Sequence, residues 1–456
     1  MRKRWLTVVS LVAALSMIAA ACGDDDSGDT TTAAPGTTAA PTTQGEGDVA
    51  FDVGVTPAPC GDAVNEGNGC IYLGVLSDLS DGPFVALAVP LTNAQSDFWA
   101  KVNADGGLDG FDVIISAENT FDTHYDPALT VEGFESIKDR VLMLAQSLGT
   151  PQTQAALPRY AEENVVAAPA TWWSGWAFTD QDQGLILESG APYCFEAMNG
   201  MSFVNDMLQP GDDFVWALVR FAGDYGGDYG NGAIAAAEAL GLPAPAADIE
   251  QLEFSRGGDA NAAIAELAQL QPNLIVIVTG PNEMATIVGG VFQSGHQAFK
   301  VLGAGPTWNV GLLAVPDLVP LLQAVYYVTG ATGNWDFDTQ GHADMRAAAE
   351  ANGRDPNNAY LAGWYWQYPV LALLQQLVAD ADLTRGHAVE VAGNLTGVSY
   401  GGILPDRDYT GTAHDQAVRS SLVFGVDPAA SDGLTPFTDA FTSEPVTAYD
   451  LSEPCG

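Results

Sequence analysis

Short apolar runs alternate with helical patterns of apolar residues from residue 71 onward. Runs typical of strands cover 71–77, 111–116, 141–145 and 165–168, and helical patterns lie between them. In one of these patterns, 127–138, Asp126 precedes Pro127 as expected for an N-cap before a proline in the first helical position. This alternation predicts a parallel sheet with helices on both faces.

The same alternation restarts near residue 214. Strand-like runs then cover 214–221, 249–254, 274–278, 301–303 and 325–329, and long helical patterns cover 338–352 and 358–379. The last of these is uncharged, but Pro369 and three glutamines favour a buried helix over a membrane span. We predict an α/β fold of two doubly wound lobes, with a ligand cleft between them and multiple hinge crossovers.

The expected boundaries follow from this pattern. We expect the first lobe at 59–192, the second lobe at 193–325, a return to the first lobe at 326–400, and a second-lobe return with the C-terminal tail at 401–456. Ligands of open α/β sheets bind at the carboxyl ends of strands. Candidate ligand residues therefore follow strands, and they include Gly280 and Asn282 after 274–278.

The N-terminus indicates export. Three basic residues at 2–4 precede an apolar run that ends in Ala19-Ala20-Ala21-Cys22, which predicts a signal peptide over 1–21. The small residues before Cys22 resemble a bacterial lipobox, and this resemblance implies a lipid on Cys22. Plain secretion and a signal anchor are the alternatives. Residues 22–58 are rich in Thr, Ala and Pro and predict a disordered tether, so we expect an extracytoplasmic protein anchored by lipid to the outer face of the cell membrane.

The strongly negative net charge of the chain excludes two classes of binding partner. The 456 residues include 57 Asp and Glu but 15 Lys and Arg, for a formal net charge of −42. Nucleic acid and anionic lipid surfaces are bound through basic side chains, so neither is an expected partner.

Four cysteines remain besides Cys22, which suggests two disulfides in an oxidising compartment. Three pairings are possible. We favour Cys60–Cys70, which closes a short Gly-rich loop, together with Cys194–Cys455, which would hold the C-terminal tail. There is no C-x-x-C motif and no nearby His, so we expect no metal site and no cofactor.

Several motifs together resemble one family. The strand 71–76 is followed by Leu79-Ser80-Asp81-Gly82-Pro83, and the first helix ends in Asn103-Ala104-Asp105-Gly106-Gly107-Leu108-Asp109-Gly110. Leu148-Gly149-Thr150-Pro151 and Asp228-Tyr229-Gly230 follow in order. This succession over about 71–425 resembles the leucine/isoleucine/valine-binding type of periplasmic solute-binding proteins of ABC importers, which have the type I binding-protein fold.

The resemblance implies the residues of a ligand site. Hydroxyls and backbone N–H groups after the first-lobe strands would hold a ligand carboxylate, and an aromatic ring of the second lobe, Tyr229, would pack over the ligand. The first-lobe residues are Ser147, Leu148, Gly149, Thr150, Ala170 and Thr171. Thr307, followed by Trp308, stands where amino-acid binders of this family carry an acidic residue. The solute therefore stays open among amino acids, amides, aromatic acids and amines.

Three tryptophans, Trp172, Trp173 and Trp176, lie within five residues in a Ser/Gly loop after a strand. A ligand-binding wall, with Trp172 in the site, and plain core packing are about equally good interpretations.

We thus expect a solute-binding receptor that closes on a small organic solute and delivers it to an ABC permease as a monomer, without catalysis. A lipid-anchored sensor or scaffold with the same fold is an alternative. A second alternative is a secreted esterase, because Ser399 lies in a G-x-S-x-G motif, although Pro405 blocks the helix that a nucleophile elbow needs.

Overall fold

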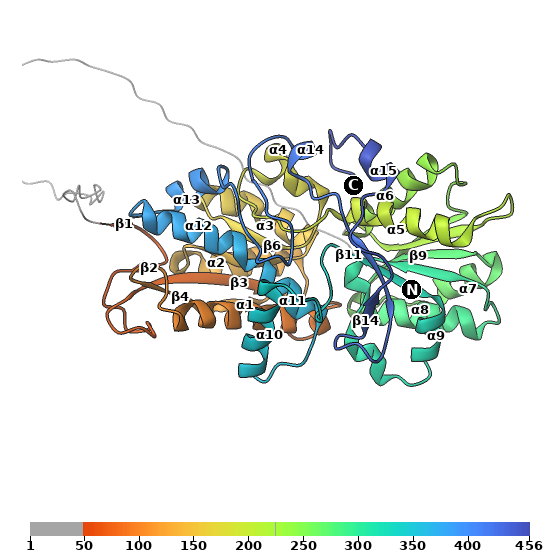
Figure 1. The fold of residues 1–456 in the computed structure, drawn as a ribbon, viewed down its shortest axis with the longest axis horizontal. Helices are drawn as coiled ribbons and strands as arrows, with labels where there is room; N and C mark the ends of the chain where they lie inside the picture. The colour runs from red at the N-terminus through yellow and green to blue at the C-terminus, as the bar shows by residue number, and fades with distance from the viewer. Residues whose placement is uncertain (1–48, 224) are drawn as a thin grey trace, which may run out of the picture. The chain divides into compact units, whose positions relative to one another are not determined.

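Two sheets organise the computed structural model, which describes residues 49–223 and 225–456 (Figure 1). In the first lobe, β3 runs parallel to β4 on one side and to β5 on the other, and β6 continues the sheet beyond β5. A short strand, β2, pairs antiparallel with the start of β3. The strands are β2 (Val55–Thr56), β3 (Gly69–Ser77), β4 (Phe111–Asp122), β5 (Met143–Leu148) and β6 (Ala167–Ala170).

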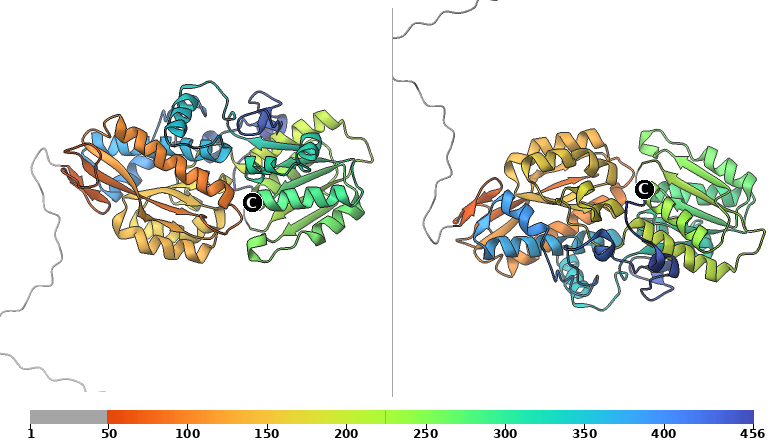
Figure 2. Two further views of the ribbon diagram at one scale, coloured as in Figure 1. Left: turned by 90° about the horizontal axis from the view of Figure 1, so that it is seen from below. Right: turned by 90° about the horizontal axis from the view of Figure 1, so that it is seen from above.

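Helices from two distant parts of the chain cover this sheet. The first group is α1 (Val85–Ala104), α2 (Pro127–Ile137), η1 (Lys138–Arg140), α3 (Thr150–Glu163), η2 (Ser174–Ala177) and α4 (Thr179–Asp182). The second is α10 (Gln340–Ala351), α11 (Asn358–Tyr365), α12 (Gln367–Ala379) and α13 (Arg385–Ala392). Both views in Figure 2 show the blue helices of the second group beside the orange first part of the chain. The predicted N-cap is confirmed, because the Asp126 side chain accepts hydrogen bonds from two backbone N–H groups of α2.

The second lobe is built on a seven-stranded sheet in the order β14-β13-β11-β10-β9-β7-β8. Its interior strand β9 has the sequence LIVIV and is buried throughout, as expected for a parallel strand covered on both faces. The strands are β7 (Trp216–Phe221), β8 (Ala247–Gln251), β9 (Leu274–Val278), β10 (Lys300–Gly303), β11 (Tyr326–Gly330), β13 (Leu422–Val426) and β14 (Leu434–Pro436). β13 and β14 run antiparallel to their neighbours.

The helical elements of this lobe are α5 (Tyr193–Leu208), α6 (Tyr225–Ala239), η3 (Phe254–Arg256), α7 (Asn261–Leu270), α8 (Pro281–Gln293), η4 (Gly305–Thr307), η5 (Val310–Ala314), α9 (Val319–Val325), α14 (Ala413–Gln416) and α15 (Glu444–Ala448). The chain passes between the lobes three times, after α4, after β11 and after α13. The prediction of two α/β lobes joined by several crossovers is confirmed. The strand β11, expected at the start of the return to the first lobe, instead belongs to the second-lobe sheet.

The predicted end of the tether at residue 58 is wrong. Ala50–Phe51 forms β1, which pairs with β12 (Asp382–Leu383), and Val55–Thr56 forms β2. Apolar and β-branched residues here pair with free strand edges, and this pairing outweighs the cost of ordering them. Residues 1–48, with the predicted signal peptide and Cys22, lie outside the described residues.

The long helical pattern over 358–379 is divided at Trp366 into α11 and α12. Both are packed in the core of the first lobe, with Trp364, Val370 and Leu373 fully buried. Within the described ranges, no helix combines the length and the apolar character that crossing a bilayer requires.

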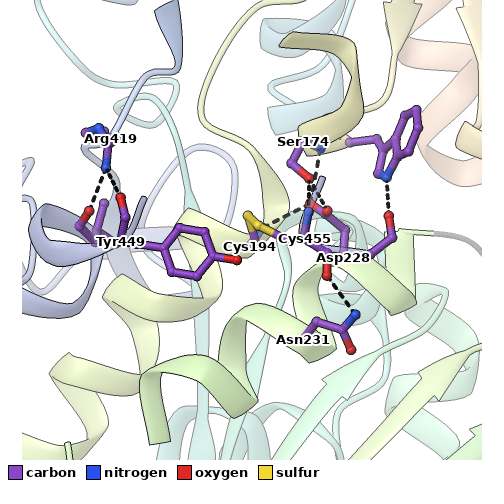
Figure 3. Close-up of a disulfide and its surroundings, with 10 residues drawn as sticks. Ser174, Cys194, Asp228, Asn231, Arg419, Tyr449 and Cys455 are labelled. Atoms are coloured by element: carbon purple, nitrogen blue, oxygen red, sulfur yellow. Dashed lines mark hydrogen bonds between the residues drawn. A yellow bond between two sulfur atoms is a disulfide. The ribbon is translucent and has the colours of Figure 1, made fainter. Parts of the chain in front are cut away.

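Both favoured disulfides are present, Cys60–Cys70 and Cys194–Cys455. The second one holds the last residues of the chain against α5, as Figure 3 shows. Around it, the Cys455 carbonyl accepts a hydrogen bond from Asn231 on α6, and the Gly456 carbonyl accepts one from the Trp173 indole of the first lobe. The C-terminus therefore contacts both lobes.

Candidate functional site

A cavity of about 140 Å³ lies between the two lobes. The first lobe contributes the start of α1, the ends of β5 and β6, and α11. The second lobe contributes the first turns of α5 and α6 and the end of β11. The cavity therefore lies at the carboxyl ends of parallel strands from both sheets, where ligands of open α/β folds bind.

Aromatic rings form much of the wall. Phe84, Tyr125, Trp172, Tyr193, Tyr225, Tyr365, Trp366 and Phe424 all line the cavity. The Trp172 ring lies 4.6 Å from Trp366 and 5.6 Å from Tyr193 between centroids, and Tyr193 lies 5.0 Å from Tyr225. A continuous aromatic surface of this kind suits an apolar or cationic ligand body, through area burial, stacking and cation–π attraction.

The tryptophan cluster divides between the two interpretations. Trp172 is half-buried and lines the cavity. Trp173 and Trp176 form an edge-to-face pair in the core behind the first-lobe sheet, 4.8 Å apart. Neither a ligand-binding wall nor core packing alone describes the cluster, because one ring lines the cavity and the other two pack in the core.

Four of the six first-lobe candidates line the cavity: Leu148, Gly149, Ala170 and Thr171. Gly149 has a φ of 94°, a conformation that favours glycine, and it is the N-cap residue directly before α3. The other two candidates lie behind this wall. Thr150 Oγ1 is 2.5 Å from Thr171 Oγ1, and Ser147 Oγ is 2.7 Å from Thr153 Oγ1. Thr150 and Ser147 therefore orient the wall without reaching the cavity.

Tyr229 does not reach the cavity. It is fully buried beneath it, with its hydroxyl 3.1 Å from Thr329 Oγ1. Tyr225 lines the cavity instead and donates a hydrogen bond to the Thr279 carbonyl. The sequence repeats Asp-Tyr-Gly at 224–226 and 228–230, so the two tyrosines lie one helical turn apart on α6, and only the first lies at the end of the helix that lines the cavity.

The remaining second-lobe candidates are also outside the cavity wall. Asn282 is exposed on α8, and Gly280 lies close to the Pro83 carbonyl of the first lobe, which a Cβ would approach to 3.2 Å. Thr307 and Trp308 are fully buried. Their side chains bond the Tyr326 hydroxyl at 2.6 Å and the Asp432 carbonyl at 3.2 Å. In this region Gly305 and Pro306, the pair before Thr307, are the residues that line the cavity.

Glu196, which the sequence analysis missed, lines the cavity from the first turn of α5. Its side chain is hydrogen-bonded to Thr329, and burial raises the pKa of its carboxyl to about 8. The only signal for it in the sequence is its spacing of three residues from Tyr193, which places both on one face of α5.

Contacts across the lobes lie beside the cavity. Arg256 of the second lobe donates to the Tyr125 carbonyl at 2.7 Å, and Asn309 donates to the Ala86 carbonyl at 2.9 Å. Phe84 of the first lobe packs against Phe221 and Tyr225. These contacts hold the lobes in a closed arrangement.

Two other chemistries find little support. Ser399 is exposed, and the segment around it is a bridge and turns rather than the strand and helix of a nucleophile elbow. In the described part of the chain, the group of side chains that meets the distance criterion for a metal site is Cys194, Asp228 and Cys455. Both sulfurs of that group are joined in a disulfide, so they are not thiolate ligands.

Comparisons with known proteins agree with this architecture. A substrate-binding protein of a fatty acid ABC transporter from Thermomonospora curvata has a TM-score of 0.76 at 24% identity, covering 88% of this chain and 97% of its own. A branched-chain amino acid ABC transporter protein from Thermus thermophilus, solved with bound valine, has a TM-score of 0.68 at 18% identity, covering 83% and 98%. A solute-binding protein from R. palustris in complex with 4-hydroxybenzoate has a TM-score of 0.67 at 13% identity, with the same coverages.

Among curated proteins, none matches this chain in sequence. The family model for periplasmic binding proteins, however, matches residues 71–433. This range spans both lobes and includes every described residue that lines the cavity except Leu434. With that match and the two-lobed fold, the chain belongs to the periplasmic binding protein family.

Proposed function

We propose that this protein is the extracytoplasmic receptor of an ABC importer, which closes on a small organic solute and delivers it to a permease. The observation that carries the proposal is the cavity between the lobes, which residues of both lobes line and beside which hydrogen bonds join the lobes. Three proteins with this fold come from ABC transporters, according to their names. Domain closure around a solute needs only differential binding to the closed state and no catalytic group.

The proposal includes the anchor and the site. Lipid on Cys22 would hold the receptor at the outer face of the membrane as a monomer. Within the site, Leu148, Gly149, Ala170, Thr171, Trp172 and Tyr225 would contact the solute from the two lobes.

A thermal stability screen of residues 23–456 against a few hundred small metabolites tests the proposal. A ligand that binds only the folded state stabilises it by about 2.7 kcal/mol at a hundredfold excess over its Kd. Loss of uptake of the same solute in cells that lack the protein would identify the receptor role. A solute that binds with no effect on uptake would instead favour the sensor, and a well-folded protein without any hit would contradict solute binding.

A further inference from the structure

Among the described acids that line the cavity, Glu196 and Asp432, Glu196 has the carboxyl that is less engaged by the protein. It is 4% exposed, and the hydrogen bond it makes in the structure is to the Thr329 side chain. Asp432 also lines the cavity, but its two carboxyl oxygens accept the backbone N–H groups of Trp335 and Leu434, at 3.0 and 3.3 Å. Glu196 therefore keeps acceptor capacity for a ligand, while Asp432 holds the backbone.

In the described ranges, no basic side chain lines the cavity beside this acid. The described residues that line the cavity include no Lys, Arg or His. The charged form of a carboxyl that is removed from water and has no cation beside it is destabilised. Such a group is stabilised either by binding a proton or by binding a cation. Burial favours the protonated form of Glu196 and raises the pKa of its carboxyl to about 8.

Titratable groups on the elements packed against α5 do not supply a cation either. These groups are Tyr225, Asp228, Tyr229 and the exposed Glu238 on α6, Tyr326 and Tyr327 on β11, Lys300 at the start of β10, and Glu444 on α15. Arg419, in the segment before β13, stacks over the Phe195 ring of α5 at 4.8 Å, but its guanidinium donates to the Val446 and Tyr449 carbonyls. Lys300 Nζ donates to the Ala324 carbonyl, Asp228 accepts from Ser174, and Glu444 is exposed. Burial raises the pKa of the Tyr229 hydroxyl and, from α11, that of Tyr365, and the nearby Glu196 carboxyl adds to both shifts.

We propose that Glu196 determines the specificity of this receptor by binding the ammonium group of an amine whose apolar body packs against the aromatic wall. This inference rests on the proposed function. Tyr193, Tyr225 and Tyr365 line the same cavity as Glu196, and aromatic ring faces attract cations. The net charge of −42 also favours approach of cations over anions. An anionic head group would meet a carboxyl and, among the described lining residues, no basic partner.

Binding of the amine is then coupled to the release of a proton from Glu196. Below the pKa of Glu196, its protonated carboxyl loses one proton to solvent as the ammonium binds, leaving a carboxylate paired with a cation. Amine affinity should therefore rise by about tenfold per pH unit up to about pH 8, and then stay level until the amine itself deprotonates near pH 10.

Three probes with one phenyl body and different head groups test this: 2-phenylethylamine, 2-phenylethanol and 3-phenylpropanoate. Calorimetry on residues 23–456 between pH 6 and 9, in buffers of different ionisation enthalpy, gives affinity and proton release together. We expect the amine to bind at least about tenfold more tightly than the other two at pH 8, with a proton released at pH 7.

Glu196→Gln keeps the size of the side chain and removes its charge. It should weaken amine binding by about tenfold or more at pH 8, abolish the pH dependence and leave the alcohol unaffected. Glu283→Gln is the matched control, because Glu283 is a 1% exposed acid of the same lobe that does not line the cavity. It should leave all three probes unchanged.

The proposal would be overturned if 3-phenylpropanoate or 2-phenylethanol bound more tightly than the amine, or if Glu196→Gln left amine binding unchanged. Either result would leave the receptor function intact. The same conclusion follows if the probes fail while the metabolite screen finds only anions or neutral solutes. Failure of every probe and every metabolite on folded protein would instead contradict solute binding itself.

Discussion

Ser174 of the first lobe and Asp228 of the second are joined by a hydrogen bond of 2.5 Å from the serine hydroxyl to the carboxyl group. The Cys455 N–H donates in turn to the Ser174 hydroxyl at 2.8 Å (Figure 3). Ser174→Ala should lower the free energy of unfolding by about 1–3 kcal/mol, because it removes a donor from a fully buried carboxyl. Urea unfolding measures this loss. Ser136→Ala is the control, since Ser136 is exposed on α2, and an equal effect of both variants would contradict the role of Ser174.

Asp228 should make the protein less stable as the pH rises from 5 to 7. Burial raises the pKa of its carboxyl to about 7, against 3.8 for a free side chain, although the surrounding donors oppose this shift. The folded state then binds a proton that the unfolded state has already released, so this group's contribution to stability is complete below about pH 4 and is lost through pH 7.

Asp228→Asn mimics the protonated acid and should reduce the slope of unfolding free energy against pH, measured by urea unfolding from pH 5 to 8. A residual slope is expected, because burial also raises the pKa of Asp182 to about 7 and that of Glu196 to about 8. Parallel curves for the variant and the parent protein would contradict the assignment to Asp228.

The two disulfides should differ in their contribution to stability. Cys194 and Cys455 are separated by 261 positions, whereas Cys60 and Cys70 are separated by 10. A crosslink that closes a longer loop restricts the unfolded chain more, so Cys194→Ser with Cys455→Ser should cost about 2–5 kcal/mol and more than the corresponding change at Cys60 and Cys70. Calorimetric melting of both double variants decides the order, and a larger loss for the short loop would refute this account.

The fold was predictable from the sequence because the apolar patterns of both sheets are strong. The run at 274–278 became β9 without a shift of either end, and the two-lobed α/β architecture is as expected. Periodicity does not show where a strand joins its sheet, and therefore β11 was placed at the wrong side of a crossover. It also missed the first strands, β1 and β2, which are two residues long and stabilised by their partners.

The site was predictable only where backbone geometry determines it. Leu148, Gly149, Ala170 and Thr171 follow strands, and the strand ends bring them to the cavity. Tyr225 and Tyr229 lie in identical tripeptides, so only the start of α6 distinguishes them. Glu196 was missed because an acid on an apolar helix face follows no motif, and its place beside Thr329 depends on how α5 packs against β11.

Tyr225 and Tyr229 should separate binding from stability. Tyr225→Ala removes a ring from the cavity wall and should weaken binding of a ligand found by the screen by about tenfold or more. Tyr229→Phe removes only the buried hydroxyl bonded to Thr329, so it should cost about 1 kcal/mol of stability and change affinity little. Calorimetric titration and urea unfolding of both variants test the assignment, which a larger affinity loss for Tyr229→Phe would reverse.

Asn309 offers a test of the closed arrangement without a change in the cavity wall. Its Nδ2 donates to the Ala86 carbonyl of the first lobe, while its Oδ1 caps η5 by accepting from the Gly311 N–H at 2.8 Å. Asn309→Asp keeps the cap oxygen but places an oxygen against the Ala86 carbonyl, which destabilises closure. A ligand that binds the closed state loses affinity in proportion to that state's lost population.

We expect Asn309→Asp to weaken binding by about 1–2 kcal/mol, or roughly 5- to 30-fold, mainly through faster dissociation. Stopped-flow tryptophan fluorescence can follow this, because Trp172 and Trp366 line the cavity. Asn394→Asp is a suitable control, since Asn394 is exposed and donates to Glu390 within the first lobe. Unchanged dissociation in Asn309→Asp, with stability also unchanged, would mean that this inter-lobe bond does not contribute to closure, and that the aromatic contacts of Phe84 hold the lobes together instead.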